Sequence, residues 1–477
     1  MQLLAERHAS VARTIWLNDV HSQLNRTQVR QVETPRGLEH LRSAVELARN
    51  NGLKISCAGG RHAMGGQQFG TDNLHLDLCE MNRLLSFDPE RRVVDVEAGM
   101  QWPQLIETLR RMQKDRLRAW GIRQKQTGAD RLCIGGALAS NVHGRGLRMR
   151  PFVEDVEGFT LITANGDLVE CTRLMNPELF RLVIGGYGMF GIVHSVRLRL
   201  MPRQRLRRVV KMSTTEDLAG DFQERINRGF MFGDFQFAID PQSWDFLRKG
   251  VFACYEPVEI GDCDESQQRL SEGDWRTLLH LAHVKPTEAF ERYARFYLAT
   301  NGQTYWSDTH QLGYYCDDYH REIDGMCRCR QPGSEMITEL CMPRMALEGF
   351  MQGARTALRH NGTRVIYGTV RLIEQDLETY LPWARGKFAC VVLNLHCQHD
   401  PQSIAQAENA FRELIDVALS CGGSFYLTYH SYAMKEQLLA AYPELPSWLE
   451  LKKEHDPDSV FESNWYRLLV RTLTVPS

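Results

Sequence analysis

The fold of this chain is decided by the stretch CIGGALASNVHG, residues 133–144. It is one of three glycine-rich segments in the first half of the sequence, and the other two are AGGRHAMGG at 58–66 and GGYGMFG at 185–191. Each lies beside a stretch with the alternation of a β-strand. Because glycine leaves backbone N–H groups unobstructed, such loops can offer several donors to one pyrophosphate group. Together the three loops predict a dinucleotide-binding site.

The third loop also fits the pattern G-x-G-x-x-G, at residues 186–191. This pattern is typical of nicotinamide-dinucleotide sites when it follows a strand and opens a helix. Here the order is reversed, because the preceding NPELFRLVI has a helical pattern and the following IVHSVRLRL alternates like a strand. The context therefore argues against a nicotinamide site. The glycines would permit close backbone approach to some other group, or simply tight turns.

Composition and charge narrow the class of protein. The chain has 477 residues, of which 43% are hydrophobic and 24% charged, and its formal net charge is −2. This length predicts two domains, and the charge gives no reason to expect nucleic-acid binding. We interpret the basic run RQRLRR, residues 203–208, as a solvated connector. No apolar stretch is long enough for a membrane span.

The cysteines indicate a reducing compartment. There are 13 of them, an odd number scattered along a long chain, which is typical of free thiols in the cytoplasm. The N-terminal residues 1–16 show no secretory signal, in agreement with a cytoplasmic protein. Cys327 and Cys329 lack the second pair or the nearby histidines of a zinc site, so we predict no metal.

Hydrophobic periodicity predicts the elements. Helices are expected at 36–52, 102–112, 177–182, 346–361 and 402–420, and helical patterns follow residue 432. Strands are expected at 53–57, 74–78, 92–98, 192–200, 334–341, 364–373, 389–397 and 424–432, with a hairpin turn at Asn165-Gly166. The character of the sequence changes after residue 204, which predicts a domain boundary there.

The three loops, in this order, resemble the vanillyl-alcohol-oxidase/p-cresol-methylhydroxylase type of FAD-binding oxidoreductase. The resemblance implies an α+β fold with a two-part FAD-binding domain, residues 1–204 and a C-terminal segment 423–477 that returns to it. Residues 205–422 would form a substrate or cap domain on an antiparallel sheet. The stretches 134–144 and 440–468 are most similar to decaprenylphosphoryl-ribose oxidase, and Arg61-His62 is similar to alditol oxidase.

The resemblance implies FAD as the cofactor, bound covalently through His62, where alditol oxidase and cytokinin dehydrogenase carry their flavin-linked histidine. Decaprenylphosphoryl-ribose oxidase lacks this histidine and binds FAD non-covalently. Two further departures are Ala63, where serine is common, and Tyr429, which replaces a lysine of that family. We interpret Cys133 as a replacement for threonine and not as a second tether. The predicted cofactor-binding residues are Ala58, Gly59, Gly60, Arg61, His62, Ala63, Gly128, Cys133, Gly135, Gly136, Ser140, Asn141, His143, Gly144, Gly191, Ile192 and Tyr426.

Oxidation of an alcohol by a flavin requires a group that takes or polarises the hydroxyl proton. The stretch 369–371 is similar to the Glu-x-Arg strand of alditol oxidase, so Arg371 keeps the cation and Thr369 replaces the carboxylate. Asn394 and His396 share one face of the next strand. Glu339 is expected to face solvent or a partner charge. The predicted catalytic residues are Arg371, His396, Tyr429 and His430.

The sequence therefore predicts an FAD-dependent oxidoreductase that oxidises a CH–OH group of a polyol, sugar or sugar-like substrate by hydride transfer to flavin N5. Oxygen or another electron acceptor would reoxidise the flavin. One alternative is oxidation of an amine or a phenol, in which the aromatic segment 305–320 would form a cage around the substrate. The other alternative is a flavin-binding protein without turnover.

Overall fold

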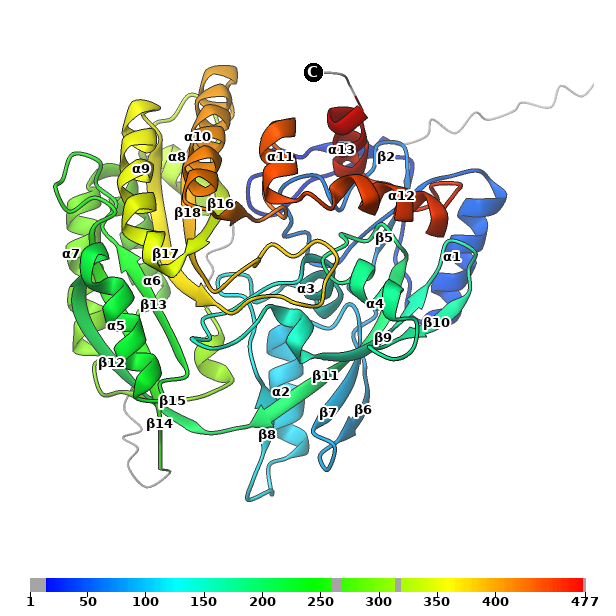
Figure 1. Ribbon diagram of the computed structural model, residues 1–477, viewed down its shortest axis with the longest axis horizontal. Helices are drawn as coiled ribbons and strands as arrows, with labels where there is room; N and C mark the ends of the chain where they lie inside the picture. The colour runs from blue at the N-terminus through cyan, green and yellow to red at the C-terminus, as the bar shows by residue number, and fades with distance from the viewer. Residues whose placement is uncertain (1–13, 260–266, 314–318, 475–477) are drawn as a thin grey trace, which may run out of the picture.

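The computed structural model describes residues 14–259, 267–313 and 319–474. Most of the N-terminal stretch and part of the aromatic segment 305–320 lie outside the described residues. The described chain forms a small parallel sheet, two larger antiparallel sheets, a two-stranded pair and the helices that cover them (Figure 1). This mixture of helices with antiparallel sheets agrees with the predicted α+β class. None of the helices within these ranges combines the length and apolar character needed to cross a membrane.

The first unit is a parallel sheet of order β3-β5-β4 with one helix packed on it. Helix α1 buries Leu41, Ala44, Val45 and Ala48, the spacing of one helical face, in the apolar cluster that also contains Leu74 and Leu76. The first glycine loop therefore begins where a buried parallel strand ends, at Ala58. The elements are β1 (Ile15–Leu17), β2 (Thr27–Val29), β3 (Gln31–Glu33), α1 (Leu38–Asn50), β4 (Ile55–Ala58) and β5 (Leu74–Asp77).

The second unit is an antiparallel sheet of order β10-β9-β11-β7-β6, with β8 paired to the end of β11. The glycine-rich segment 133–144 is not a loop throughout, because residues 134–140 form the helix α3. The inverted context of the G-x-G-x-x-G pattern is confirmed, since it lies between α4 and β11. The elements are β6 (Leu84–Asp88), β7 (Val93–Glu97), α2 (Trp102–Met112), β8 (Trp120–Ile122), α3 (Ile134–Ser140), β9 (Val156–Ile162), β10 (Leu168–Cys171), α4 (Pro177–Val183) and β11 (Ile192–Pro202).

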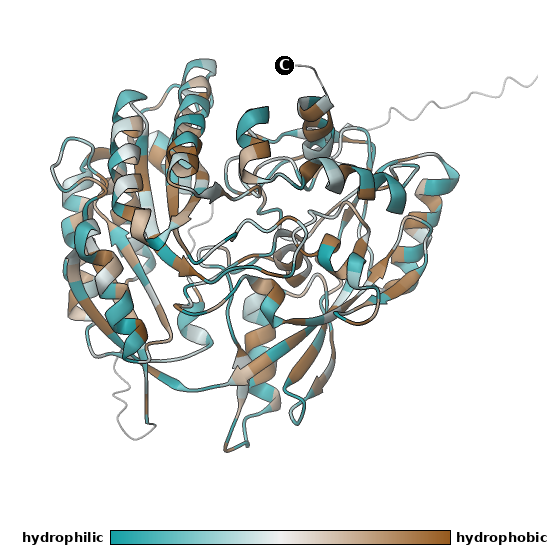
Figure 2. Ribbon diagram, in the orientation of Figure 1, coloured by the Kyte–Doolittle hydropathy of each residue, from teal (hydrophilic) through white to brown (hydrophobic). Residues whose placement is uncertain are grey.

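The third unit is an eight-stranded antiparallel sheet of order β15-β12-β14-β13-β17-β18-β16-β19. Its helices carry both hydrophobic and hydrophilic residues along their length (Figure 2), as expected when one face of a helix packs on a sheet. The strands are β12 (Arg205–Thr214), β13 (Phe232–Phe237), β14 (Lys249–Val258), β15 (Thr304–Trp306), β16 (Gly333–Pro343), β17 (Arg364–Ile373), β18 (Phe388–Gln398) and β19 (Ser424–Phe425). The helices are α5 (Thr215–Asn227), α6 (Glu272–Val284), α7 (Pro286–Ala299), α8 (Tyr319–Met326), α9 (Leu347–His360) and α10 (Pro401–Ser420).

The C-terminal segment lies against the first glycine loop. Met64 donates its backbone N–H to the carbonyl of Thr428 at 3.0 Å, and the N–H of Ile55 reaches the carbonyl of Val460 at 2.7 Å. The predicted strand 424–432 is wrong in its length, because only two residues pair and the rest crosses irregularly towards the loop. The helices that follow are α11 (Lys435–Ala441), α12 (Leu445–His455) and α13 (Asn464–Thr474).

The basic run at 203–208 is not a solvated connector. From Arg205 onward it belongs to β12, which pairs with β14 along ten residues. Arg203 packs over the ring of Trp306 and its Nε donates to Asp308 at 2.7 Å. Charge alone suggested exposure for the whole run. Arg207 is exposed and pairs with Glu256, whereas Arg203, Arg205 and Arg208 lie over aromatic rings.

Candidate active site

One cavity of about 1130 Å³ lies between the glycine loops and the eight-stranded sheet. Its wall includes Gly59 and Gly60 of the first loop, Gly135 and Gly136 of α3, and Gly191 before β11. The opposite wall comes from β13, β16, β17 and β18 and from the irregular segment after β19. A site for a single drug-sized ligand is usually about 300–1,000 Å³. This cavity therefore has room for a large cofactor and a substrate together.

The glycines of the first loop are required by close packing against the second. A Cβ atom added to Gly59 would lie 2.6 Å from Cys133 Sγ, and one added to Gly60 would overlap the carbonyl oxygen of Arg131. Arg61 follows with φ 56, in the left-handed region. The loop can thus turn its backbone towards the cavity only because these positions have no side chain.

His62 lies in the cavity wall, and its imidazole contacts a second histidine. Its Nδ1 is 2.8 Å from His21 Nε2, and the backbone of Arg131 hydrogen-bonds the ring as well. Burial, and then the neighbouring His21, lower the pKa of His62 to about 3. The ring is therefore neutral at physiological pH.

A polar cluster faces the loops from the strand side. Glu339 on β16 is 2% exposed, and its Oε1 lies 2.5 Å from His143 Nε2. The hydroxyl of Tyr429 donates to the other carboxylate oxygen at 3.4 Å. Burial opposes the ionisation of Glu339, but His143 and then Arg371 outweigh it, so the pKa of Glu339 is below its usual value. A carboxylate thus stays ionised in the wall of an enclosed site, where it can accept a proton.

Glu339 was expected to face solvent or a partner charge, and the second alternative is confirmed by its ion pair with His143. On β16 the residues Glu335, Ile337 and Glu339 share one face, and all three line the cavity. A strand face that borders a large cavity has the same polar pattern as one that borders bulk solvent, so alternation alone did not distinguish them.

A second group of side chains at the strand side combines arginines with aromatic rings. Arg208 lies 4.6 Å from the centroid of the Tyr305 ring and 5.1 Å from that of Tyr297, and its Nε donates to Tyr255 Oη at 3.0 Å. Arg145 donates to the carbonyl of His310 at 2.8 Å. Sequence reasoning missed both arginines, because nothing in the local pattern distinguishes a buried arginine over tyrosine rings from a surface one.

The cavity wall includes most of the predicted site residues. These are Ala58, Gly59, Gly60, Arg61, His62, Ala63, Gly128, Gly135, Gly136, Ser140, His143, Gly191 and Tyr426 on the cofactor side, and Arg371 and Tyr429 on the catalytic side. Tyr426 donates its hydroxyl to the carbonyl of Ser140 at 2.5 Å, so it holds the end of α3 as well as facing the cavity. The roles of these residues stay predictions.

Six predicted residues lie behind the wall. Cys133 is buried against Cys79, with 4.0 Å between the sulfur atoms, as a structural residue would be. Ile192 packs in the apolar cluster of α1, and Gly144 lies against the backbone of Lys125. The remaining three are Asn141, His396 and His430.

His430 and His396 have different surroundings, neither of them in the wall of the cavity. His430 stacks on Tyr432 with 5.4 Å between ring centroids, and burial lowers its pKa to about 4. His396 lies opposite Glu335 in the pairing of β18 with β16. Neither imidazole therefore reaches the cavity directly, as a base acting on a bound substrate would have to do.

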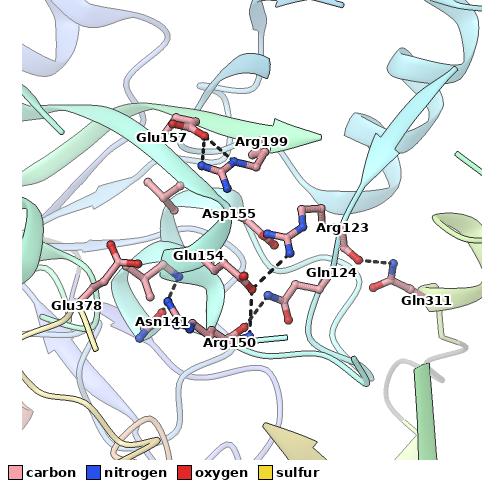
Figure 3. Close-up of polar contacts among 12 residues, drawn as sticks. Arg123, Gln124, Asn141, Arg150, Glu154, Asp155, Glu157, Arg199, Gln311 and Glu378 are labelled. Carbon is pink, nitrogen blue, oxygen red and sulfur yellow. Dashed lines mark hydrogen bonds and ion pairs between the residues drawn. The ribbon is translucent and has the colours of Figure 1, made fainter. Parts of the chain in front are cut away.

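Asn141 is a structural junction. It ends α3 in the left-handed region at φ 48, and its side-chain oxygen accepts from the N–H of Val153 at 2.9 Å. Its side-chain amide donates to Asp376 at 2.9 Å, and Trp383 Nε1 donates to its carbonyl. Figure 3 shows the polar network around this junction, in which Arg123 pairs with Asp155 at 2.5 Å. The network fixes where α3 ends and so where its glycines face.

Comparison with known proteins relates the N-terminal part of the chain to flavoenzymes. Residues 29–172 match the family model of an FAD binding domain. L-gulonolactone oxidase of Bos taurus is 27% identical over 199 residues, which are 42% of this chain and 43% of that enzyme. The L-gulonolactone oxidase of Scyliorhinus torazame is 27% identical over 204 residues, 43% of this chain and 44% of that enzyme. The mitochondrial L-galactono-1,4-lactone dehydrogenase of Brassica oleracea is 28% identical over 205 residues, 42% of this chain and 33% of that protein.

The aligned region spans less than half the length of these curated relatives. The match supports FAD as the cofactor and a relationship to FAD-dependent oxidases and dehydrogenases of sugar lactones. The closer similarity to decaprenylphosphoryl-ribose oxidase and alditol oxidase stays a prediction.

Proposed function

We propose that this chain is an FAD-dependent oxidoreductase that oxidises a CH–OH group of a sugar-like substrate, either a sugar lactone or a polyol. The observation that carries the proposal is that the glycine loops and the cluster of Glu339, His143 and Tyr429 line one cavity. The names of the relatives, L-gulonolactone oxidase and L-galactono-1,4-lactone dehydrogenase, support the substrate class.

The residues of the loop side fit FAD. The glycine backbone of the first loop and of α3 faces the cavity, and Thr127, also in the wall, has a buried hydroxyl without a hydrogen-bond partner among the described residues. These groups are donors of the kind that a pyrophosphate takes up. When bound, FAD supplies the acceptor for the hydride that leaves the substrate carbon.

We further propose that His62 forms the covalent bond to the flavin. A neutral imidazole is required for such a bond, and the low pKa of His62 keeps the ring neutral. The contact with His21 holds the ring in place at 2.8 Å. Covalent attachment would fix the cofactor against the loop and raise its potential.

The chain's own contribution to chemistry is the handling of the hydroxyl proton. Glu339 is ionised and buried, so it can accept the proton either directly or from Tyr429, whose hydroxyl already donates to it. Arg371 lines the same wall, and its Nε has no hydrogen-bond partner among the described residues. A guanidinium in that place stabilises negative charge that develops on the substrate oxygen.

The aromatic residues of the cavity favour phenol oxidation as a second candidate. Tyr293, Tyr297, Tyr305 and Trp306 all line the wall. Oxidation of an amine fits less well, because the guanidinium of Arg208 already occupies the faces of Tyr297 and Tyr305.

The test is anaerobic reduction of the purified holoprotein by a panel of L-gulonolactone, L-galactono-1,4-lactone, alditols, amines and phenols. Bleaching of the flavin absorbance with a lactone or polyol supports the proposal. Bleaching with a phenol alone establishes the second candidate, and bound flavin that no compound reduces indicates a protein without turnover. Mixing the reduced protein with oxygen or with a quinone, and following the return of the flavin absorbance, identifies the electron acceptor.

Covalent attachment is tested separately by acid precipitation. Flavin should remain with the wild-type protein, should be released from His62→Ala, and should remain with the control His360→Ala, whose imidazole is exposed beside Glu413. Complete release of flavin from the wild type would refute the tether while leaving the proposed reaction in place.

A further inference from the structure

A second polar cluster lies at the edge of the cavity, on the side of His21. Its members are His283 on α6, Glu335 on β16 and His396 on β18. Glu335 lines the cavity, whereas the two imidazoles lie behind it at 3% and 5% side-chain exposure. The proposed oxidation does not use any of the three.

The hydrogen bonds of this cluster leave three facing atoms unsatisfied. His283 Nδ1 lies 2.8 Å from the carbonyl oxygen of Leu279, so this nitrogen carries the proton and Nε2 of the neutral ring is an acceptor. Among the described residues, none forms a hydrogen bond with His283 Nε2, Glu335 Oε1 or His396 Nδ1, and all three atoms are buried. Buried polar atoms that converge without hydrogen-bond partners are unfavourable unless a cation or a water molecule lies between them.

The spacing of these atoms suits a metal ion. Glu335 Oε1 is 3.6 Å from His283 Nε2 and 3.9 Å from His396 Nδ1, and the three atoms all lie within 4.8 Å of one another. Two ligands at about 2.1 Å from a tetrahedral zinc ion are about 3.4 Å apart. The ligand atoms are therefore close to the required separation before any metal binds.

The chemistry of the donors also suits an ion of the zinc class. Two imidazoles and one carboxylate form a common donor set for divalent transition metals. The bond from His283 Nδ1 to a backbone carbonyl is the usual outer contact of a metal-binding histidine, since it fixes the tautomer and the ring orientation. His320 lies next to the set, with Nε2 at 2.8 Å from the other oxygen of Glu335, and it lines the cavity.

We propose that His283, Glu335 and His396 bind one divalent transition-metal ion, with Zn²⁺ as the best match. The fourth position faces the side of His320 and the cavity, where a water molecule or an oxygen atom of a ligand can complete the coordination. Spacing along the sequence did not predict this site, because the ligands come from three separate elements.

A second set of possible ligands, His143, Glu339 and Cys390, is a poorer site. Glu339 is already hydrogen-bonded to His143 at 2.5 Å, and the sulfur atoms of Cys341 and Cys390 are in contact at 3.4 Å. A metal ion would have to displace these contacts, whereas no described residue forms a hydrogen bond with the ligand atoms of the first set.

The experiment uses the full-length protein, stripped with a chelator and titrated with Zn²⁺ in a calorimeter and with Co²⁺ in a spectrophotometer. We expect one ion per chain and the ligand-field bands of Co²⁺ bound to nitrogen and oxygen. Glu335→Gln, which keeps the shape of the side chain, and His283→Ala should each weaken Zn²⁺ binding by at least about tenfold, the smallest loss typical of altered metal surroundings.

Two control variants distinguish the proposed site from other possible metal ligands. Cys390→Ser removes a ligand of the second set, and His360→Ala removes an exposed imidazole that lies 3.2 Å from a carboxylate. Both should bind Zn²⁺ as the wild type does. The proposal is overturned if wild-type protein takes up no stoichiometric metal, if Glu335→Gln and His283→Ala bind as tightly as wild type, or if Cys390→Ser alone loses the ion.

Discussion

The carboxylate of Glu339 can be tested by replacing it with an isosteric amide. Glu339→Gln keeps a side-chain oxygen that can accept a hydrogen bond from His143 or Tyr429, but it removes the charge and the ability to take a proton. If Glu339 accepts the substrate proton, flavin reduction should slow by about 10²–10⁴-fold, the usual contribution of a positioned general base. The rate is measured by anaerobic stopped-flow spectroscopy with the best reducing substrate of the panel.

Stability measurements separate this effect from a loss of folding. Glu339 is 2% exposed and lies 2.5 Å from His143, so Glu339→Ala leaves a buried imidazole and a buried phenol without their acceptor. Removal of one partner from such a buried pair costs about 3–5 kcal/mol of unfolding free energy. Urea denaturation should therefore show a large loss for the alanine variant and a smaller one for the glutamine variant.

The contribution of Glu339 to the free energy of unfolding should depend on pH in a defined direction. The pKa of Glu339 in the folded protein is below the usual value of 4.5, so its contribution to stability is present above that value and is lost as the pH falls through the lower, folded-state pKa. Wild-type protein should lose this contribution in acid, and Glu339→Gln should not. A glutamine variant that is folded, binds flavin and reduces it at the wild-type rate would refute the role of Glu339 as the base.

Three further predictions concern the loops and the arginine site. Gly59→Ala should reduce flavin retention, because its Cβ would lie 2.6 Å from Cys133 Sγ. The control Gly302→Ala, which has open space at φ +88, should keep its flavin and cost only about 1–2 kcal/mol of unfolding free energy; equal flavin content in both variants would contradict the packing argument. Asn141→Ala should lower the unfolding free energy by about 1–3 kcal/mol through its lost buried hydrogen bonds, and the exposed Asn176→Ala, at φ 49, should lose less in the same denaturation assay. Arg208→Gln should admit cationic substrates to the tyrosine faces, so amine-dependent flavin reduction should rise from its wild-type level; an unchanged substrate profile would show that this arginine does not select against amines.

Local pattern was enough to predict most elements of this fold. Helix α2 and strand β17 have their predicted ends, and β18 and β16 lie within one and two residues of theirs, because each has a strong apolar period and a clear stop. Strand β12 was missed, because its arginines have the pattern of a solvated connector. Their partners, Trp306, Tyr255 and Tyr305, lie far along the chain, and no local rule relates them.

The candidate site could be predicted on its loop side far better than on its strand side. Tight turns and close backbone contacts require glycine, and glycine clusters are visible in the sequence. The loop residues around His62 could therefore be predicted. The site residues on the strand side depend on which face of β16 borders the cavity. They also depend on which residues of β18 pair with β16; Glu335, for example, lies opposite His396. Such pairings are set by the assembled sheet. The cytoplasmic location and the absence of nucleic-acid binding stay predictions of composition.

The two acidic residues of β16 give the cavity two functional ends. Glu335 and Glu339 are four residues apart on one strand face, which separates them by about 13 Å along the strand. A metal ion at Glu335 is therefore too far away to act on a proton taken up at Glu339. Its effect on the proposed reaction would be to hold a distant oxygen atom of the substrate. Loss of the metal should then raise KM for an extended substrate and leave kcat unchanged, and it should leave both constants unchanged for a substrate too short to reach Glu335.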